Sequence, residues 1–132
     1  MRARRPELGA QCITPYTKAM ASTVLAITAS ALLLITAVYH LTGLRQVTAE
    51  LSGERLGLTK AAWIGIALDW MLIAAAWIAA AFQLLPTFAF SLGAALSFTS
   101  AIVVAIALGV RFPGVWLLGG ASVCAVAAHL LR

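Results

Sequence analysis

Four long apolar runs constrain the fold of this chain more than any other feature. They lie at about residues 21–42, 61–83, 88–110 and 114–131, and each is about 18 to 23 residues long. An α-helix rises about 1.5 Å per residue, so a run of this length crosses the roughly 30 Å hydrocarbon core of a bilayer. The runs lack the alternation of a transmembrane β-strand and are about twice its length. The sequence therefore predicts four transmembrane helices.

Composition points to the same solvent. Hydrophobic residues make up 63% of the 132-residue chain and charged residues only 10%, so most of the surface is expected to face lipid. The formal net charge is +5, but the basic residues flank the apolar runs, where they suit anionic headgroups. We therefore expect membrane lipids as partners and no nucleic acid.

The last three runs are separated by tight turns. The turn sequences "QLLPT" and "RFPG" each contain a proline that stops a helix. Short turns make neighbouring helices antiparallel. The predicted fold is all-α: an integral membrane, four-helix, up-down bundle that forms one domain over residues 21–131.

Two segments outside the apolar runs are polar. Residues 1–20 are predicted to be a basic, mostly extended N-terminal tail, and residues 43–60 the one sizeable loop. Leu44, Val47 and Leu51 fall on one helical face, so the loop holds either a short interfacial helix or a plain solvated segment. The first apolar run is too long for a signal peptide's core, so it is expected to be retained.

Basic residues are divided almost evenly between the two sides of the predicted bundle. The side with both termini holds Arg2, Arg4, Arg5, Lys18 and Arg132, and the other holds Arg45, Arg55, Lys60 and Arg111. The positive-inside rule favours cytoplasmic termini by this small excess. We expect a bacterial inner membrane as the location.

The third apolar run has a small residue at every fourth position: Ala89, Gly93, Ser97, Ala101, Ala105 and Gly109. Small residues let a neighbouring backbone approach closely, which is what packs helices in lipid. The pattern predicts a helix-packing seam. Gly120, Cys124 and Ala128 repeat the interval in the fourth run, so the partner is either that helix or another copy of the chain.

Asp69 is the only acidic residue inside an apolar run. A carboxylate at the centre of a transmembrane helix costs roughly 2.5–3.5 kcal/mol on insertion scales, so it is typically paired, neutral or hydrated. Its helical face is mostly small, with Ala62, Gly65 and Ala76 among its neighbours. We therefore expect Asp69 to point into a packed interface.

Three tryptophans in the same run, Trp63, Trp70 and Trp77, are spaced by seven and form an adjacent face. They are interpreted as interfacial anchors and core filling, or alternatively as a stacking surface around a ligand. Trp70 falls near mid-bilayer and must pack against a neighbour or bond a polar group, so it is a candidate binding residue.

His40 and Arg111 are predicted to lie near one membrane face, with Asp69 about 12 Å deeper. Roofed by Trp63 and Trp116, these three side chains form the candidate binding or relay cluster. The alternative is that His40 only reaches toward the interface and that Arg111 only anchors headgroups.

Catalytic and metal-binding motifs are absent from the sequence. There is no Cys-x-x-Cys, glycine-rich phosphate loop or nucleophile elbow. His129 is predicted to lie roughly 20 Å in depth from His40, so the two cannot jointly ligate a haem. We expect no catalytic residues, no metal, no cofactor and no enzymatic activity.

Two functions are favoured, and a membrane enzyme that uses the same cluster is the third alternative. The first is an accessory, assembly or structural subunit of a larger membrane complex, which docks through small-residue seams onto other transmembrane helices or onto its own copies. The second is a small transporter or channel, in which Asp69 exchanges a proton or cation and His40 acts as relay.

Overall fold

The computed structural model describes residues 8–132 as four α-helices, with side chains described from Tyr16 onward. The helices are α1 (Leu8–Thr48), α2 (Gly53–Ala81), α3 (Phe88–Leu108) and α4 (Pro113–Leu130). Each is long and apolar enough to cross a membrane. The sequence prediction of an all-helical chain with four such helices is confirmed.

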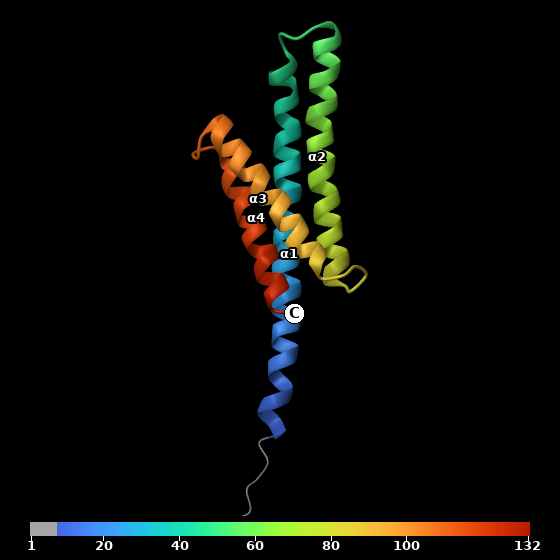
Figure 1. The fold of residues 1–132 in the computed structure, drawn as a ribbon, viewed down its shortest axis with the longest axis vertical. Coiled ribbons are helices and arrows are strands. Elements are labelled where there is room, and N and C mark those ends of the chain that lie inside the picture. The colour runs from blue at the N-terminus through green and yellow to red at the C-terminus, as the bar shows by residue number, and fades with distance from the viewer. Residues whose placement is uncertain (1–7) are drawn as a thin grey trace, which may run out of the picture.

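The four helices form two unequal pairs (Figure 1). α1 and α2 lie side by side, and the shorter α3 and α4 lie together across them. α1 packs against both α2 and α4, whereas α2 and α3 touch over a much smaller region. The end of the α1–α2 hairpin extends beyond the α3–α4 turn. The central helix of the fold is therefore α1.

The ends of α1 differ from the sequence prediction. The helix begins at Leu8, inside the segment 1–20 that we predicted to be extended, and it runs on through residues 43–48. Residues 1–7, which hold Arg2, Arg4 and Arg5, lie outside the described residues. Once a helix is nucleated, each further residue adds a hydrogen bond at little cost, so polar residues extend it beyond the apolar run.

The predicted loop 43–60 is accordingly a short turn. Only residues 49–52 separate the first two helices, because α2 begins at Gly53. Gly53 has a φ of 57°, a left-handed conformation that glycine adopts without strain. Neither a separate interfacial helix nor a long solvated loop is present between α1 and α2.

In every helix, one series of buried positions is spaced alternately by three and four residues. They are Ser22, Ala26, Ala29, Leu33 and Thr36 in α1; Ala67, Trp70, Ala74, Trp77 and Ala81 in α2; Phe90, Ala94, Ser97 and Ala101 in α3; and Gly114, Leu118, Ala121, Ala125 and Ala128 in α4. This 3.5-residue average is the repeat of left-handed coiled-coil packing. Most of these side chains are small, so the helices pack closely.

The small-residue seam of α3 lies on the packed face only at its centre. Gly93, Ser97 and Ala101 are buried, whereas Ala89 and Ala105 are half-buried and Gly109 is exposed in the turn. A step of four residues advances about 40° around the helix, because each residue turns about 100°. A strict four-residue stripe therefore winds off the packed face, and Gly109 instead ends α3 with a φ of 87°.

At Gly93 the seam packs against α2. A Cβ atom on Gly93 would lie 2.5 Å from Nε1 of Trp77 and 2.8 Å from Cγ2 of Ile73. Trp77 is fully buried, and its Nε1 donates a hydrogen bond to the carbonyl oxygen of Ala89 at 3.2 Å. The close approach of α3 to α2 therefore depends on the missing side chain of Gly93.

Serine hydroxyls on α1 join it to its neighbours. The Ser22 hydroxyl donates to the carbonyl oxygen of Ala128 in α4 at 2.7 Å. The Ser30 hydroxyl is shared between Ala26 of its own helix, at 2.9 Å, and Ala74 of α2, at 3.1 Å. Such hydrogen bonds between helices add to van der Waals packing where no water competes.

Candidate functional site

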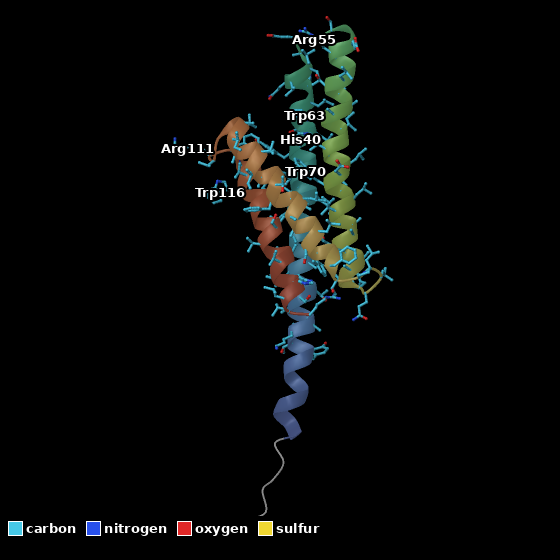
Figure 2. All side chains as sticks on the ribbon, in the orientation of Figure 1. His40, Arg55, Trp63, Trp70, Arg111 and Trp116 are labelled. Atoms are coloured by element: carbon cyan, nitrogen blue, oxygen red, sulfur yellow. The ribbon has the colours of Figure 1, made fainter. Side chains whose placement is uncertain are left out.

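His40 lies between two tryptophans of α2 (Figure 2). Its ring stacks on Trp63 with centroids 4.0 Å apart and planes 8° from parallel, and it meets Trp70 edge-on at 5.1 Å. Nε1 of Trp63 donates a hydrogen bond to the backbone carbonyl oxygen of His40 at 2.6 Å. The imidazole is thus held by two aromatic contacts, and the backbone that carries it is tied to α2.

The helical repeat explains why these residues meet. His40 follows Thr36 by four residues and so continues the inward face of α1, and Trp63 and Trp70 continue the inward face of α2. The short turn at residues 49–52 folds α2 back along α1, which places the two faces together. Two of the three tryptophans therefore contact His40, and Trp77 fills the core below them.

A pocket of about 760 Å³ opens beside this cluster and receives residues from all four helices. Its polar and aromatic lining includes Thr36, Tyr39, His40, Gln46, Trp63, Trp70, Thr99, Ser100 and Phe112. Aliphatic residues of α3 and α4, such as Val103, Val104 and Leu118, complete the wall. Among residues 16–132, whose side chains the structure describes, no lysine, arginine, aspartate or glutamate lines the pocket.

The hydrogen bonds of the lining residues leave a distinctive pattern. The hydroxyls of Thr36, Thr99 and Ser100 each donate to a backbone carbonyl one turn earlier in their own helices. A hydroxyl has one hydrogen to donate, so these oxygens keep only acceptor capacity. Nε2 of His40 is buried and has no hydrogen-bond partner. The polar lining of the pocket therefore consists of hydroxyl acceptors, the amide of Gln46, the phenol of Tyr39 and the ring of His40, whose Nε2 is buried.

Asp69 does not belong to this cluster. Its side chain is exposed on the outer face of α2, and it makes no hydrogen bond or ion pair with any of residues 16–132. Asp69 is therefore not in a packed interface among the described residues, and that it points into an interface with another helix stays a prediction. Small residues occur on both faces of α2, and the inward face is the one marked by Trp63, Trp70 and Trp77.

Arg111 and Trp116 also lie away from His40. Both are exposed, and Figure 2 shows them at the outer edge of the α3–α4 pair. Arg111 and Asp69 line neither described pocket. Of the four predicted binding or relay residues, the structure brings together His40 and Trp70 and separates them from the two charged ones.

Several pocket residues were not singled out from the sequence. Tyr39 and Phe112 line the pocket, with their rings 5.9 Å apart and tilted by 49°. Thr99 and Ser100 form an adjacent hydroxyl pair inside the third apolar run, which was an available signal for a polar site. Phe112 lies in the α3–α4 turn, and nothing in the local sequence pattern predicted its position.

The opposite end of the bundle carries a smaller pocket of about 400 Å³. Lys18, Gln83 and Arg132 are among its lining residues. Nε of Arg132 donates to the Ser22 hydroxyl at 3.1 Å, its Nη2 donates to the carbonyl oxygen of Ala81, and its guanidinium lies 5.6 Å from the centroid of Phe90. Arg132 thus joins the C-terminus to the three other helices.

His129 lies at this end as well. Its Nδ1 is 3.2 Å from the carbonyl oxygen of Thr87, at the start of α3. Among the described residues, no group of three His, Cys, Asp or Glu side chains is placed to hold a metal ion.

Comparisons of the chain with protein-family models, with curated proteins and with solved structures return no match.

Proposed function

We propose that this protein is an integral membrane, four-helix, up-down bundle that serves as an accessory subunit of a larger membrane complex. In this proposal it docks through the outer face of α2 onto a transmembrane helix that carries a basic side chain. The observation that carries the proposal is Asp69, a carboxylate in the middle of an apolar helix, exposed and unpaired among the described residues.

The surface of the bundle supports a membrane location. Large apolar side chains are exposed along all four helices, among them Val38, Leu72, Ile106 and Val123. An apolar exterior of this extent suits acyl chains and would make a soluble protein aggregate. The short turns between consecutive helices support the up-down arrangement, with both termini on the same side.

The depth of Asp69 makes its exposure costly. It lies 12 positions before Ala81, which is about 18 Å along α2 from the end where α3 begins. A charged side chain at that depth costs roughly 2.5–3.5 kcal/mol on insertion scales unless a partner or water offsets the cost. A basic side chain on a docked helix supplies such a partner.

The outer face around Asp69 also has room for a helix. A Cβ on Gly65, one turn before Asp69, would meet no atom within 4 Å. Ala62, one turn before Gly65, is also exposed. Leu72, three residues after Asp69, is 68% exposed. A small residue beside a carboxylate lets a second backbone approach closely enough for its side chain to reach the acid.

A partner of different sequence fits this face better than a second copy. Every described Lys and Arg of this chain, such as Lys18, Lys60 and Arg111, lies outside the apolar runs 21–42, 61–83, 88–110 and 114–131. In a symmetric pair, two Asp69 carboxylates would face each other and repel unless they shared a proton. A basic residue of a different chain avoids that conflict.

Photo-crosslinking from the Asp69 face tests the proposal. A crosslinking amino acid at Leu72 is compared with one at Val123 of α4, because both positions are 68% exposed. In native membranes, Leu72 should crosslink to a transmembrane peptide that holds Lys or Arg, and Asp69→Leu should abolish the product. Val123 should crosslink only to lipid.

Three outcomes would overturn the proposal. Crosslinks from Leu72 to lipid alone would mean that the face is unoccupied. Crosslinks to the same region of a second copy would replace the heteromeric partner by a symmetric dimer. A crosslinked partner that persists in Asp69→Leu would show that the carboxylate plays no part in docking.

A further inference from the structure

The pocket beside His40 has the composition of a ligand site. Its volume of about 760 Å³ falls within the range of roughly 300–1,000 Å³ that is usual for small-molecule sites. Such sites combine apolar walls with a few polar groups that fix the ligand's orientation. Here the polar groups come from α1 and α3, and the aromatic groups from α1, α2 and the α3–α4 turn.

We infer that this pocket binds an uncharged lipophilic phenol or hydroquinone: an aromatic ring with a hydroxyl group and an apolar chain. The ring hydroxyl contacts His40 and the hydroxyl oxygens of α3, and the chain lies along the aliphatic wall. This inference is independent of how Asp69 is used, because Asp69 does not line the pocket.

A ligand hydroxyl, which both donates and accepts, matches the unused hydrogen-bonding groups of the pocket: hydroxyl oxygens that accept, and the Tyr39 phenol and Gln46 amide that can also donate. Thr36, Thr99 and Ser100 have each committed their only hydrogen to a backbone carbonyl, so their oxygens can accept but not donate. A ligand hydroxyl donates to one of these oxygens and accepts from an Nε2–H of His40, or donates to Nε2 in the other tautomer. Either arrangement satisfies the nitrogen that is buried without a partner.

The absence of charge in the pocket excludes a phospholipid headgroup as the recognised group. None of its lining residues is Lys, Arg, Asp or Glu, so no side chain is present to neutralise a phosphate or ammonium group. A neutral hydroxyl loses much less solvation free energy on entering such a site. The remaining ligand surface is apolar, to match the aliphatic residues on α3 and α4.

Aromatic side chains favour a ring in the ligand. Three aromatic residues that line the pocket come from three different segments: Tyr39 from α1, Trp70 from α2 and Phe112 from the α3–α4 turn. Aromatic pairs in offset or edge-on geometry contribute about 0.5–1.5 kcal/mol beyond the area that they bury. Tyr39 is 46% exposed and Val103 is 59% exposed, so the pocket is open at the outer surface of the bundle. Within a bilayer, a lipophilic ligand enters through that opening.

The two histidines of the chain provide a direct assay. Protein labelled with 15N-histidine is placed in nanodiscs of zwitterionic lipid and titrated with 4-dodecylphenol. The Nε2 signal of His40 should shift and saturate, whereas His129, at the other end of the bundle, should not respond. Dodecylbenzene, which has the same chain and ring but no hydroxyl, should leave both signals unchanged.

Matched variants locate the binding site. Val103→Trp fills the pocket, whereas Ile102→Trp introduces the same side chain at an exposed neighbouring position outside it. Val103→Trp should weaken dodecylphenol binding by at least about tenfold, and Ile102→Trp should not. Thr99→Val removes a hydrogen-bond acceptor and should weaken dodecylphenol binding by up to about tenfold. Thr28→Val, which alters the same kind of hydroxyl away from the pocket, should have no effect.

The same titrations can overturn the inference. An equal His40 shift with dodecylbenzene would mean that the pocket recognises only apolar volume. Parallel, unsaturated shifts of both histidines would mean that the phenol only partitions into the bilayer. Unchanged binding in Val103→Trp, with the helical circular dichroism of the wild type, would place the phenol somewhere else.

Discussion

The imidazole of His40 stacks on the indole of Trp63 with ring centroids 4.0 Å apart, and Nε1 of the same indole donates to the His40 carbonyl oxygen at 2.6 Å. One side chain therefore holds both the ring and the backbone of its neighbour. The pair joins α1 to α2 at the wall of the pocket, below the α1–α2 turn and close to the level of Arg111 (Figure 2).

Trp63→Phe should destabilise the protein by about 1–2 kcal/mol, because it removes the hydrogen bond to His40 and reduces the stacking area. The measurement is thermal or denaturant unfolding of purified protein in detergent. Trp116→Phe is the matched control, because Trp116 is 70% exposed. Equal losses in the two variants would contradict a specific role for Trp63.

Gly93→Ala should destabilise the fold by about 1–3 kcal/mol, because its Cβ would press on the buried ring of Trp77. Gly119→Ala is the control, which tests whether replacing any helical glycine by alanine destabilises the fold. A Cβ at Gly119 meets nothing within 4 Å, and alanine is the better helix former, so this variant should be as stable as the wild type or more so. Unfolding midpoints of the two variants in one detergent decide the point.

Asp69→Asn and His40→Ala should have additive effects on the stability of the isolated protein. No hydrogen bond or ion pair joins the two residues, so their interaction energy should be below about 0.5 kcal/mol in a double-mutant cycle. The positive control is the cycle of His40→Ala with Trp63→Phe, whose rings are in contact. Coupling of Asp69 to His40 as strong as in that control would revive the relay hypothesis.

Arg132→Gln should lower stability by about 1–2 kcal/mol, a value reduced from that of a buried charge because the residue is largely exposed. The substitution removes the guanidinium from Ser22, from the Ala81 carbonyl and from the ring of Phe90. Arg111→Gln makes the same chemical change at an exposed turn and should leave the unfolding midpoint unchanged. The comparison uses thermal unfolding of both variants.

Single cysteines at Tyr16 and Ser52 should be labelled from opposite sides of the membrane by an impermeant maleimide, after Cys12 and Cys124 are replaced. Both positions are exposed, and they lie near opposite ends of the described span of α1. Labelling is compared in sealed inverted and right-side-out vesicles. Modification of both cysteines from one side would contradict the transmembrane placement of α1.

The helices themselves could be predicted from the sequence because their signal is local. A continuous apolar run identifies a membrane-length helix wherever it occurs, and Pro113 marks the start of α4 as its residue type predicts. Helix ends in polar sequence were less accessible. Nothing in the residues before Tyr16 or after Thr42 distinguishes a helix that continues from one that frays.

The direction that each helix faces was harder to predict. In α2 the correct signal was the seven-residue spacing of Trp63, Trp70 and Trp77, which matches the 3.5-residue repeat of all the buried faces. The small residues around Asp69 instead predicted that the face carrying Asp69 points inward. Small side chains permit close packing but do not require it, so they mark an inward and an outward face of α2 equally well.

The pocket depends on packing that no local pattern encodes. It forms because α3 leaves α2 after a short contact, which opens space between His40 and the Thr99–Ser100 pair. The contact from which the two helices diverge involves Gly93 and Trp77, which do not themselves line the pocket. The sequence identified His40 and Trp70 as candidates, but their shared surroundings came only from the tertiary structure.

The length of α1 has a mechanical consequence. Its 41 residues make a continuous rod about 60 Å long, roughly twice the thickness of the hydrocarbon core. In the proposed membrane setting, tilting shortens its span too little to hide it, so the rod stands in water on both sides. A helix without a break turns and slides as one stiff body. A displacement of one protruding end of α1 therefore also moves Ser22 and Ser30, whose hydroxyls bond α4 and α2.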